Sequence, residues 1–167
     1  CAQQLSRLSR VPNQTHNSHL IIAKIDEFIE YGVFATRNIE VDEFIGCYFG
    51  EIVRAPTSDE QRLRKHYAMG MELFSVDGES LAGTSEFHVD GERVRNILPF
   101  VNHSQTANCV GAWLVWAAMP VFVLRAATHI AKGEQLVYCY GKTWAKMRGI
   151  DERDLVADSA PGKLPGY

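Results

Sequence analysis

Short apolar runs, rich in β-branched residues and separated by turn residues, make up much of this chain. The runs HLIIAKI (19–25), YGVFATRNI (31–39) and DEFIGCYFGEIV (42–53) predict three strands, because such residues favour extended, half-buried backbone. We expect turns between them at Glu30–Gly32 and Val41–Glu43. The first part of the chain is therefore typical of a β-rich fold.

The next part of the chain begins with the signature of a helix. The segment TSDEQRLRKHYA (57–68) starts with N-cap candidates and acidic residues and continues with basic residues, an order that suits the helix dipole. The segments MGMELFSVDGESLAG (69–83) and EFHVDGERV (86–94) carry Asp-Gly or Gly-Glu turn signals between apolar pieces. They predict further short strands.

The C-terminal part continues the β pattern. Two long β-rich runs, AWLVWAAM (112–119) and PVFVLRAAT (120–128), are separated at Met119-Pro120, where we expect a hairpin turn. The run HIAKGEQLVYCYG (129–141) predicts a last strand that ends at Tyr-Gly, and KTWAKMRG (142–149) is a helix candidate. Many short strands with a helical insert predict a mainly β domain.

Length, composition and charge agree with one soluble domain. The chain has 167 residues, of which 46% are hydrophobic and 22% charged, and these values are typical of a globular protein with a single core. A net charge of −3 offers no basic field for nucleic acid or an anionic membrane. No apolar run reaches the roughly 18 residues of a membrane span. The polar N-terminus begins with Cys, so we expect an excised segment rather than a signal peptide.

The four cysteines do not form a metal-binding pattern. They lie far apart at positions 1, 47, 109 and 139, with no Cys-x-x-Cys pair and no His at ligand spacing. We expect reduced thiols, in the cytosol or the nucleus, and no metal site.

Four segments carry candidate chemistry: EYGVFA (30–35), CYFGEI (47–52), LPFVNHSQTANC (98–109) and LVYCYG (136–141). Strand alternation puts Tyr48 with Gly50 on one face, and Tyr138 with Tyr140 on one side opposite Cys139. Each segment also has a purely structural interpretation, such as a glycine with positive φ or a tyrosine at a sheet corner. A functional interpretation requires the four segments to converge.

The order of these segments resembles that of the SET-domain protein lysine methyltransferases. That family has a Gly-x-Gly turn, a Tyr-x-Gly-Glu strand, an Arg-Phe-x-Asn-His-Ser-Cys-x-Pro-Asn segment and a Gly-Glu-Glu-Leu-x-x-x-Tyr-Gly end. Here they read EYG, YFGE, PFVNHSQTAN and GEQLVYCYG. The resemblance implies a mainly β, β-clip fold of several small sheets with a knot-like threaded C-terminal segment and a short helical insert. We expect an N-terminal extension (1–17), a SET domain (18–144) with an insert at about 54–88, and a C-terminal tail (145–167).

The resemblance also implies a site for S-adenosyl-L-methionine, with S-adenosyl-L-homocysteine as product. Asn102 is expected to accept from the ammonium of this cofactor, and His103 to present its backbone to the adenine. Trp144 is expected against the adenine, although a tryptophan there could equally fill the core, just as His103 could be a buried structural histidine. The expected cofactor-binding residues are Glu30, Tyr31, Gly32, Val33, Asn102, His103, Tyr140 and Trp144.

The reaction implied is transfer of a methyl group to a lysine amine. Free lysine has a pKa of about 10.4, so only about one part in a thousand is neutral at pH 7. An apolar, aromatic channel lowers that pKa, and in-line positioning supplies much of the remaining acceleration. Tyr140 and Tyr48 match the catalytic and channel tyrosines, and Phe122 is expected near the position that sets the degree of methylation. The expected channel consists of Tyr48, Phe122, Tyr138 and Tyr140.

The chain departs from the family pattern at several positions. Glu30 replaces the first glycine of the turn, and Pro99 replaces the arginine before Asn-His-Ser. Gln105 and Ala107 stand where the family has Cys and Pro, and Cys139, which replaces an Asp, is expected to pack inward. No cysteine follows Cys139 in this sequence, so we do not expect the Cys-rich zinc-binding segment that often follows the domain.

Three hypotheses follow. The first is an intracellular protein-lysine methyltransferase acting on a histone tail, and then nuclear, or on another lysine-containing protein, and then cytoplasmic. The second is a catalytically degenerate SET module that binds a protein, which Glu30 and Pro99 favour; the third is a β structural domain with chance motifs. The joint presence of Tyr48, Asn102, His103 and Tyr140 favours the enzyme. We predict no direct contact with nucleic acid or membrane, and the oligomeric state stays open.

Overall fold

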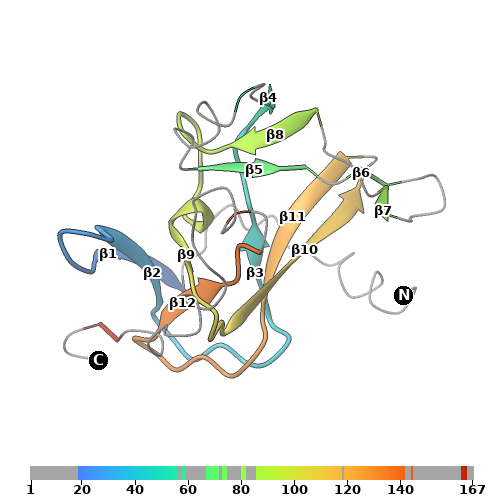
Figure 1. Ribbon diagram of the computed structural model, residues 1–167. Helices are drawn as coiled ribbons and strands as arrows, with labels where there is room; N and C mark the ends of the chain where they lie inside the picture. Colours follow the sequence, from blue (N-terminus) through green and yellow to red (C-terminus); the bar gives the residue numbers. More distant parts are fainter. Residues whose placement is uncertain are drawn as a thin grey trace.

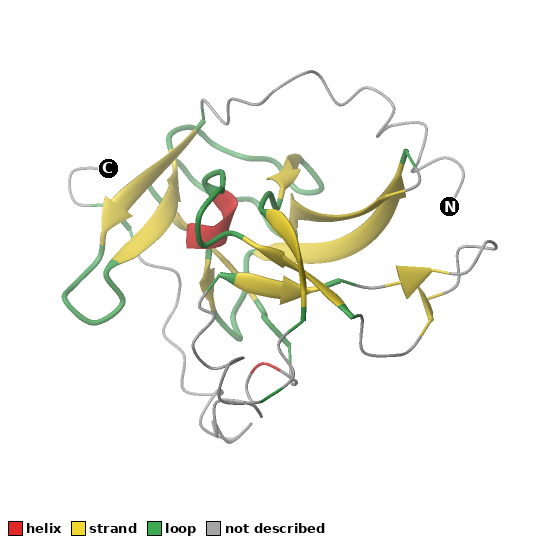
Figure 2. Cartoon of the chain, turned by 90° about the horizontal axis from the view of Figure 1, so that it is seen from above, coloured by secondary structure: helices red, strands yellow, loops and turns green. Residues whose placement is uncertain are grey.

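The computed structural model describes residues 19–55, 58, 67–71, 73–74, 80–81, 86–117, 119–141, 144 and 163–164. Within this part the strands form three sheets (Figure 1), and a 3-10 helix, η1 (Leu98–Phe100), lies among them (Figure 2). No helix in the described ranges has the length and apolar character to cross a membrane. The predicted mainly β fold of several small sheets is confirmed, whereas the predicted helices at 57–68 and 142–149 fall almost entirely outside the described residues.

The largest sheet has seven strands, with β12 near its centre. β12 pairs with β2 on one side in antiparallel fashion and with β9 and β10 in parallel fashion, and all four of its residues are buried. The spatial order is β1 (Leu20–Lys24), β2 (Tyr31–Ala35), β12 (Gln135–Tyr138), β10 (Cys109–Trp116), β11 (Met119–Ala126) and β3 (Phe44–Cys47), with β9 (Asn102–His103) beside β12.

Strands β10 and β11 form a long hairpin whose turn lies two residues earlier than predicted. Trp116 pairs with Met119, and the turn includes Ala117, whose φ is 48°. Pro120 lies inside β11, opposite Val115. In such a hairpin the residue pair next to the turn is hydrogen-bonded and the following pair, here Val115 and Pro120, is not, so the missing N–H of Pro120 breaks no bond to β10. On its other side β11 pairs with β3 only at residues 123–125, so Pro120 needs no N–H there either.

The predicted strand at 42–53 is two strands that belong to different sheets. β3 ends at Cys47, and β4 (Glu51–Arg54) pairs with β8 (Phe87–Asp90), which also pairs with β5 (Ala68–Gly70). A Cβ built at Gly50 would lie 2.6 Å from the carbonyl oxygen of Asp90, so only glycine fits where the chain changes sheets. The third sheet is the pair β6 (Leu73–Phe74) and β7 (Ser80–Leu81).

The hydrophobic core is built mainly by the largest sheet and η1, and Val89 of β8 also belongs to it. Its fully buried side chains come from segments far apart in sequence, and Leu98 and Val101 seat the segment that contains Asn102 and His103. The largest of these side chains are Ile39, Ile45, Leu98, Leu124, Ile130, Leu136, Val33 and Val101.

The polar residues that follow the apolar stretch 98–101 form hydrogen bonds with backbone groups of β12. Asn108 is 4% exposed; its Nδ2 donates to the carbonyl of Gln135 at 2.8 Å, and its Oδ1 accepts from the Val137 N–H at 3.0 Å. The Ser104 N–H donates to the carbonyl of Tyr138 at 3.2 Å. An amide that can both donate and accept thus extends the short parallel ladders beside β12. The threaded, knot-like path stays a prediction.

Candidate active site

A rigid turn joins β1 to β2. The Asp26 carboxylate accepts from the backbone N–H groups of Phe28 and Ile29, at 2.8 and 2.6 Å, and these bonds hold the pKa of Asp26 below its ordinary value. The Ile25 N–H donates to the carbonyl of Glu30 at 2.8 Å. The turn therefore spans residues 27–29, earlier than the predicted Glu30–Gly32, and Tyr31 and Gly32 belong to β2.

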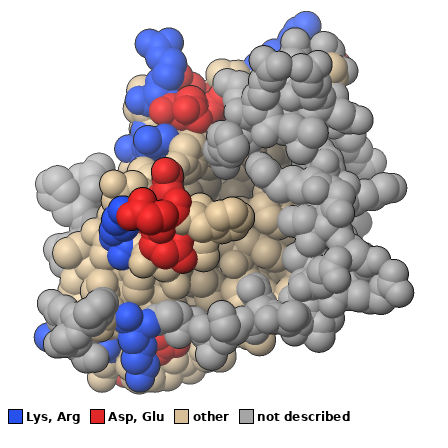
Figure 3. Space-filling view, turned by 60° about the vertical axis from the view of Figure 1, so that its left-hand side comes forward, with Lys and Arg blue, Asp and Glu red and all other residues tan. Residues whose placement is uncertain are grey.

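Glu30 has the backbone conformation of a glycine. Its φ is 67°, in the left-handed region that side chains other than Gly, Asn and Asp seldom adopt. The replacement of the family's first glycine by Glu30 thus leaves a glycine-like turn. The exposed carboxylates of Asp26, Glu27 and Glu30 lie on this hairpin. Figure 3 shows the side of the molecule that carries the hairpin, and acidic side chains lie near the centre of that view.

Asn102, in β9, is hydrogen-bonded to the start of β2, just after this turn. Its Nδ2 donates to the carbonyl of Tyr31 at 2.8 Å, and no partner for its Oδ1 occurs among the described residues. A Cβ at Gly32 would lie 3.2 Å from Asn102 Nδ2 and 2.7 Å from Gln135 Nε2, so the glycine allows these two side chains to lie close to the backbone of β2. Val33 is fully buried and Tyr31 is 47% exposed. Gly32, which has no side chain, and Val33, whose side chain is buried, can therefore present only backbone groups to a ligand.

His103 packs against two aromatic rings that also contact each other. Its Nδ1 accepts from the Tyr140 N–H at 3.0 Å, and its ring centroid is 5.3 Å from that of Tyr140 and 4.8 Å from that of Trp144. Tyr140 and Trp144 meet edge to face at 5.0 Å. We call Glu30–Val33, Asn102, His103 and Trp144 the turn cluster.

The hydroxyls of Tyr48 and Tyr140 both donate to backbone carbonyls. Tyr140 Oη donates to the oxygen of Val101, and Tyr48 Oη donates to the oxygen of Tyr67, each at 2.6 Å. Because a phenol has one proton, each donation leaves the oxygen lone pairs as acceptors. Both hydroxyls are thereby fixed in direction.

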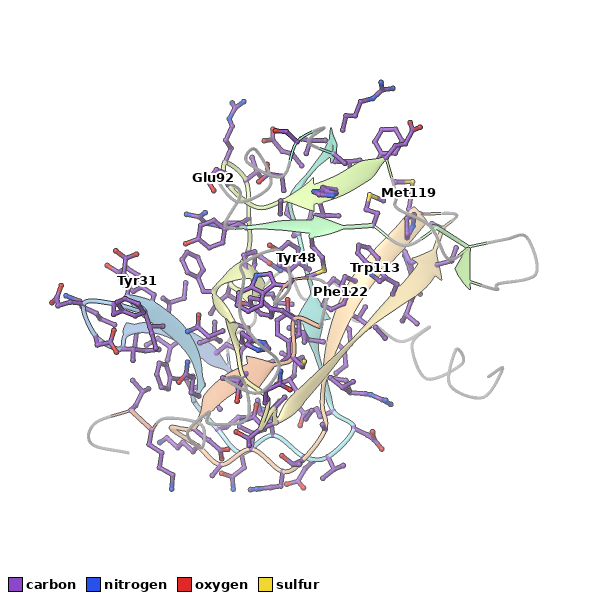
Figure 4. All side chains as sticks on the ribbon, in the orientation of Figure 1. Tyr31, Tyr48, Glu92, Trp113, Met119 and Phe122 are labelled. Carbon is purple, nitrogen blue, oxygen red and sulfur yellow. The ribbon has the colours of Figure 1, made fainter. Side chains whose placement is uncertain are left out.

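Four aromatic residues, Tyr48, Phe122, Tyr138 and Tyr140, form what we call the aromatic cluster. The Tyr138 ring lies 4.7 Å from that of Tyr140 and 5.8 Å from that of Phe122, whose carbonyl accepts from the Tyr48 N–H at 2.8 Å. Tyr48, Phe122 and Trp113 lie near the middle of the molecule, whereas Tyr31 lies out on the β1–β2 hairpin (Figure 4). Tyr140 belongs to this cluster and also touches His103 and Trp144, so it joins both clusters.

Burial keeps the phenols of Tyr48 and Tyr138 neutral. Removal from water, together with the nearby Tyr140, raises the pKa of Tyr48 and of Tyr138 well above that of a free phenol. Both residues are less than 10% exposed, at 8% and 6%. Within the described residues the Tyr138 hydroxyl has no hydrogen-bond partner. Neither tyrosine is therefore suited to act as a base near neutral pH.

The structure brings the predicted residues into two adjoining groups, with one correction. Tyr138 and Tyr140 lie on the same side, as alternation predicts, but Cys139 is exposed, so the prediction that it packs inward was wrong. Reasoning from the sequence missed Trp113, whose ring lies 5.4 Å from that of Phe122, and the Tyr67 carbonyl. Correct placement of the hairpin turn would have paired Trp113 with Phe122; no local signal marks Tyr67.

Comparisons with known proteins agree with this geometry. A family model described as SET domain matches residues 30–141, more than half of the 167 residues. The chain is 30% identical over 112 residues to a "Histone-lysine N-methyltransferase, H3 lysine-4 specific" of Schizosaccharomyces pombe, covering 65% of this chain and 11% of that protein. It is 26% identical over 140 residues to the Arabidopsis thaliana "Histone-lysine N-methyltransferase MEDEA", covering 82% and 19%. The chain thus spans at most a fifth of these relatives' lengths.

A solved structure supports the fold. The "crystal structure of KRYPTONITE in complex with mCHH DNA, H3(1-15) peptide and SAH" superposes with a TM-score of 0.57 at 20% identity, covering 74% of this chain and 23% of that one. The chain therefore belongs to the SET domain family and is related to histone-lysine N-methyltransferases.

Proposed function

We propose that this protein is a protein-lysine N-methyltransferase that uses S-adenosyl-L-methionine. The observation that carries the proposal is the position of Tyr140. Its hydroxyl is fixed on the carbonyl of Val101, and its ring contacts the turn cluster on one side and Tyr138 on the other. A cofactor held by the turn cluster and an amine held by the aromatic cluster would therefore both lie beside Tyr140.

The turn cluster fits the proposed cofactor by the chemistry of its donors and acceptors. Asn102 Oδ1 is an acceptor of fixed direction for an ammonium, because Nδ2 is bound to Tyr31. Backbone groups from Glu30 to Val33, together with the Trp144 ring, provide polar contacts and an apolar surface for a nucleoside. Of the exposed carboxylates on the β1–β2 hairpin, Glu27 is paired with Lys24, while Asp26 and Glu30 add negative charge that favours a cationic ligand. When bound, S-adenosyl-L-methionine supplies a methyl group on a positive sulfur.

The aromatic cluster suits a neutral amine. Its apolar surroundings penalise a charged lysine, and so lower the pKa of that lysine toward the working pH. The oxygen lone pairs of Tyr48 and Tyr140 can accept an N–H from the amine or weak C–H contacts from a methyl group, since each hydroxyl proton is held by a carbonyl. These residues thus orient the nucleophile and exclude water; because their hydroxyl protons stay on the phenols and are donated to carbonyls, they do not take a proton from the amine as general bases.

The proposed substrate is a lysine of a histone tail, with action in the nucleus. The Schizosaccharomyces pombe relative is named as specific for lysine 4 of histone H3, and the solved relative was crystallised with an H3(1-15) peptide. Another lysine-containing protein is the second candidate, with the cytoplasm as its location.

The experiment is methyl transfer from labelled S-adenosyl-L-methionine to histones and to a panel of other lysine-rich proteins. The native protein should label at least one of them. Tyr140→Phe should lower the rate by about a hundredfold or more, because a fixed group at the reacting atoms is lost, while cofactor affinity stays nearly unchanged. Wild-type turnover in Tyr140→Phe would contradict the proposed role. Tight cofactor binding with no product on any substrate would favour a degenerate, protein-binding module instead.

A further inference from the structure

One carbonyl outside both clusters determines where the Tyr48 hydroxyl points. The oxygen of Tyr67 accepts from the Tyr48 hydroxyl at 2.6 Å and also from the Gly91 N–H at 2.9 Å. Tyr67 immediately precedes β5, and Gly91 immediately follows β8. The position of Tyr48 therefore depends on how the Tyr67 residue is held against the loop after β8.

The guanidinium of Arg95 holds the Tyr67 ring. Arg95 Cζ lies 4.4 Å from the centroid of the Tyr67 ring and 4.9 Å from that of Phe100, and the two rings are 5.7 Å apart. Arg95 Nη1 donates to the carbonyls of Gly91 and Glu92, at 3.0 and 3.3 Å. A planar cation anchored to backbone in this way attracts both rings electrostatically and fixes their spacing.

Each of the two rings belongs to, or directly precedes, the residue whose carbonyl accepts one of the two tyrosine hydroxyls. Tyr67 provides the acceptor for Tyr48, while Phe100 immediately precedes Val101, whose carbonyl is the acceptor for Tyr140. The Arg95 hydrogen bonds go to the carbonyls of Gly91 and Glu92 and not to either hydroxyl, although its charge acts on the Tyr48 phenol, and Arg95 lies on the exposed loop before η1. It is well placed to set the distance between the two acceptors without touching the reacting atoms.

We propose that Arg95 is a positioning residue for methyl transfer, which acts by clamping Tyr67 and Phe100 so that the hydroxyls of Tyr48 and Tyr140 keep their directions. This inference rests on the proposed lysine methyltransferase function. A purely structural role would alter stability alone. A positioning role lowers kcat, leaves cofactor affinity unchanged and depends on the presence of the Tyr48 hydroxyl.

The kinetic test compares Arg95→Gln with Arg93→Gln, which removes an exposed arginine of the same loop that makes no ring contact or ion pair within the described residues. Because exposed cation–π contacts are weak, Arg95→Gln should fold, and its kcat should fall by about threefold to tenfold with the cofactor Kd unchanged. Arg93→Gln should match the native protein. Arg95→Lys keeps the charge and should recover part of the rate, but not all, since it lacks the planar group.

A double variant separates positioning from a general loss of stability. In the Tyr48→Phe background, Arg95→Gln should cost less than it does alone, because one of the two hydroxyls it positions is gone. Equal losses in both backgrounds, or a kcat for Arg95→Gln equal to that of Arg93→Gln, would overturn the proposal.

A spectroscopic measurement keeps the two proposals separable. In the cofactor-free protein with 13C-labelled tyrosine rings, the Tyr48 and Tyr67 resonances, assigned with Tyr48→Phe and Tyr67→Phe, should shift in Arg95→Gln and stay in place in Arg93→Gln. If the native protein methylates no substrate, the proposed function is contradicted. The tyrosine resonances would still show whether Arg95 positions Tyr48. Unchanged resonances in Arg95→Gln would sink the inference even if the enzyme is active.

Discussion

The turn cluster and the aromatic cluster adjoin at Tyr140 but are built in different ways. In the turn cluster the groups proposed to meet a ligand are largely backbone groups, of a chain that the Asp26 carboxylate and Asn102 Nδ2 hold in place. In the aromatic cluster they are side-chain hydroxyls held by backbone carbonyls. One half therefore depends on chain conformation and the other on the identity of each side chain.

This difference explains where the chain departs from its family. Glu30 stands in place of a glycine, yet its φ of 67° preserves the turn. Tyr48 and Tyr140 match the family motif, because no other side chain combines an aromatic ring with a hydroxyl at that reach. Substitutions should accordingly affect cofactor binding in the turn cluster and turnover in the aromatic cluster.

The largest expected effect is the pH dependence of turnover. Because burial raises the pKa of Tyr48 and Tyr138, neither loses its proton at moderately alkaline pH, and the substrate lysine is the group that titrates. With an amine pKa of about 10.4, kcat/KM should rise about tenfold per pH unit between pH 7 and 9. Peptide methylation rates at subsaturating peptide would measure this slope. A decline within that range would show that a phenol ionises and that the cluster is not as dry as its burial indicates.

Asn102→Ala should weaken cofactor binding, which is the proposed role of the turn cluster. Asn102 Oδ1 is the expected acceptor for the cofactor's ammonium, and a hydrogen bond to a charged group contributes about 1.5–3 kcal/mol, so the cofactor Kd should rise by about tenfold or more. Calorimetric titration with S-adenosyl-L-homocysteine measures this. Tyr48→Phe, in the aromatic cluster, should leave that Kd nearly unchanged. Equal losses of affinity in both variants would mean that the two clusters are not separate in function.

The sequence could predict the chemical groups of the site better than their supports. Alternation in LVYCYG places Tyr138 and Tyr140 together, and the contact between their rings confirms this. The polar segment after Asn102 is buried only at Ser104 and Asn108, whereas Gln105 and Thr106 are exposed. Such features depend on residues close in sequence, so a local pattern can reveal them.

The supports depend on contacts between distant segments. Tyr48 and Tyr67 are 19 residues apart, and their contact goes through a carbonyl, which any residue could provide. The hairpin turn at Ala117 contains no Gly or Asn at that position, and Met119-Pro120 gave a false turn signal because this proline occupies a strand position that needs no N–H. Cys139 is exposed because β12 ends at Tyr138.

A smaller effect is expected from Tyr138→Phe. Within the described residues the Tyr138 hydroxyl has no partner although the residue is 6% exposed, so it is free to bind the amine or a water beside it. Removing this oxygen should enlarge the space at the amine, and should raise the ratio of di- and trimethylated to monomethylated product several-fold. Mass spectrometry of a methylated peptide gives this ratio. A change produced by Phe122→Tyr but not by Tyr138→Phe would instead assign the degree of methylation to Phe122, as the sequence alone suggested.

The smallest expected effect tests whether the turn cluster depends on backbone conformation. Glu30→Gly removes the strain of a side chain at positive φ but adds freedom to the unfolded chain, so the free energy of unfolding should change by no more than about 1 kcal/mol. Glu30→Val places a β-branched side chain in the same left-handed conformation and should lower that free energy by about 1–2 kcal/mol. Urea unfolding measures both, and cofactor affinity should be kept in Glu30→Gly and reduced in Glu30→Val. If Glu30→Gly instead loses affinity while Glu30→Val keeps its stability, the carboxylate rather than the backbone turn makes the contact, and the contrast between the two clusters fails at this residue.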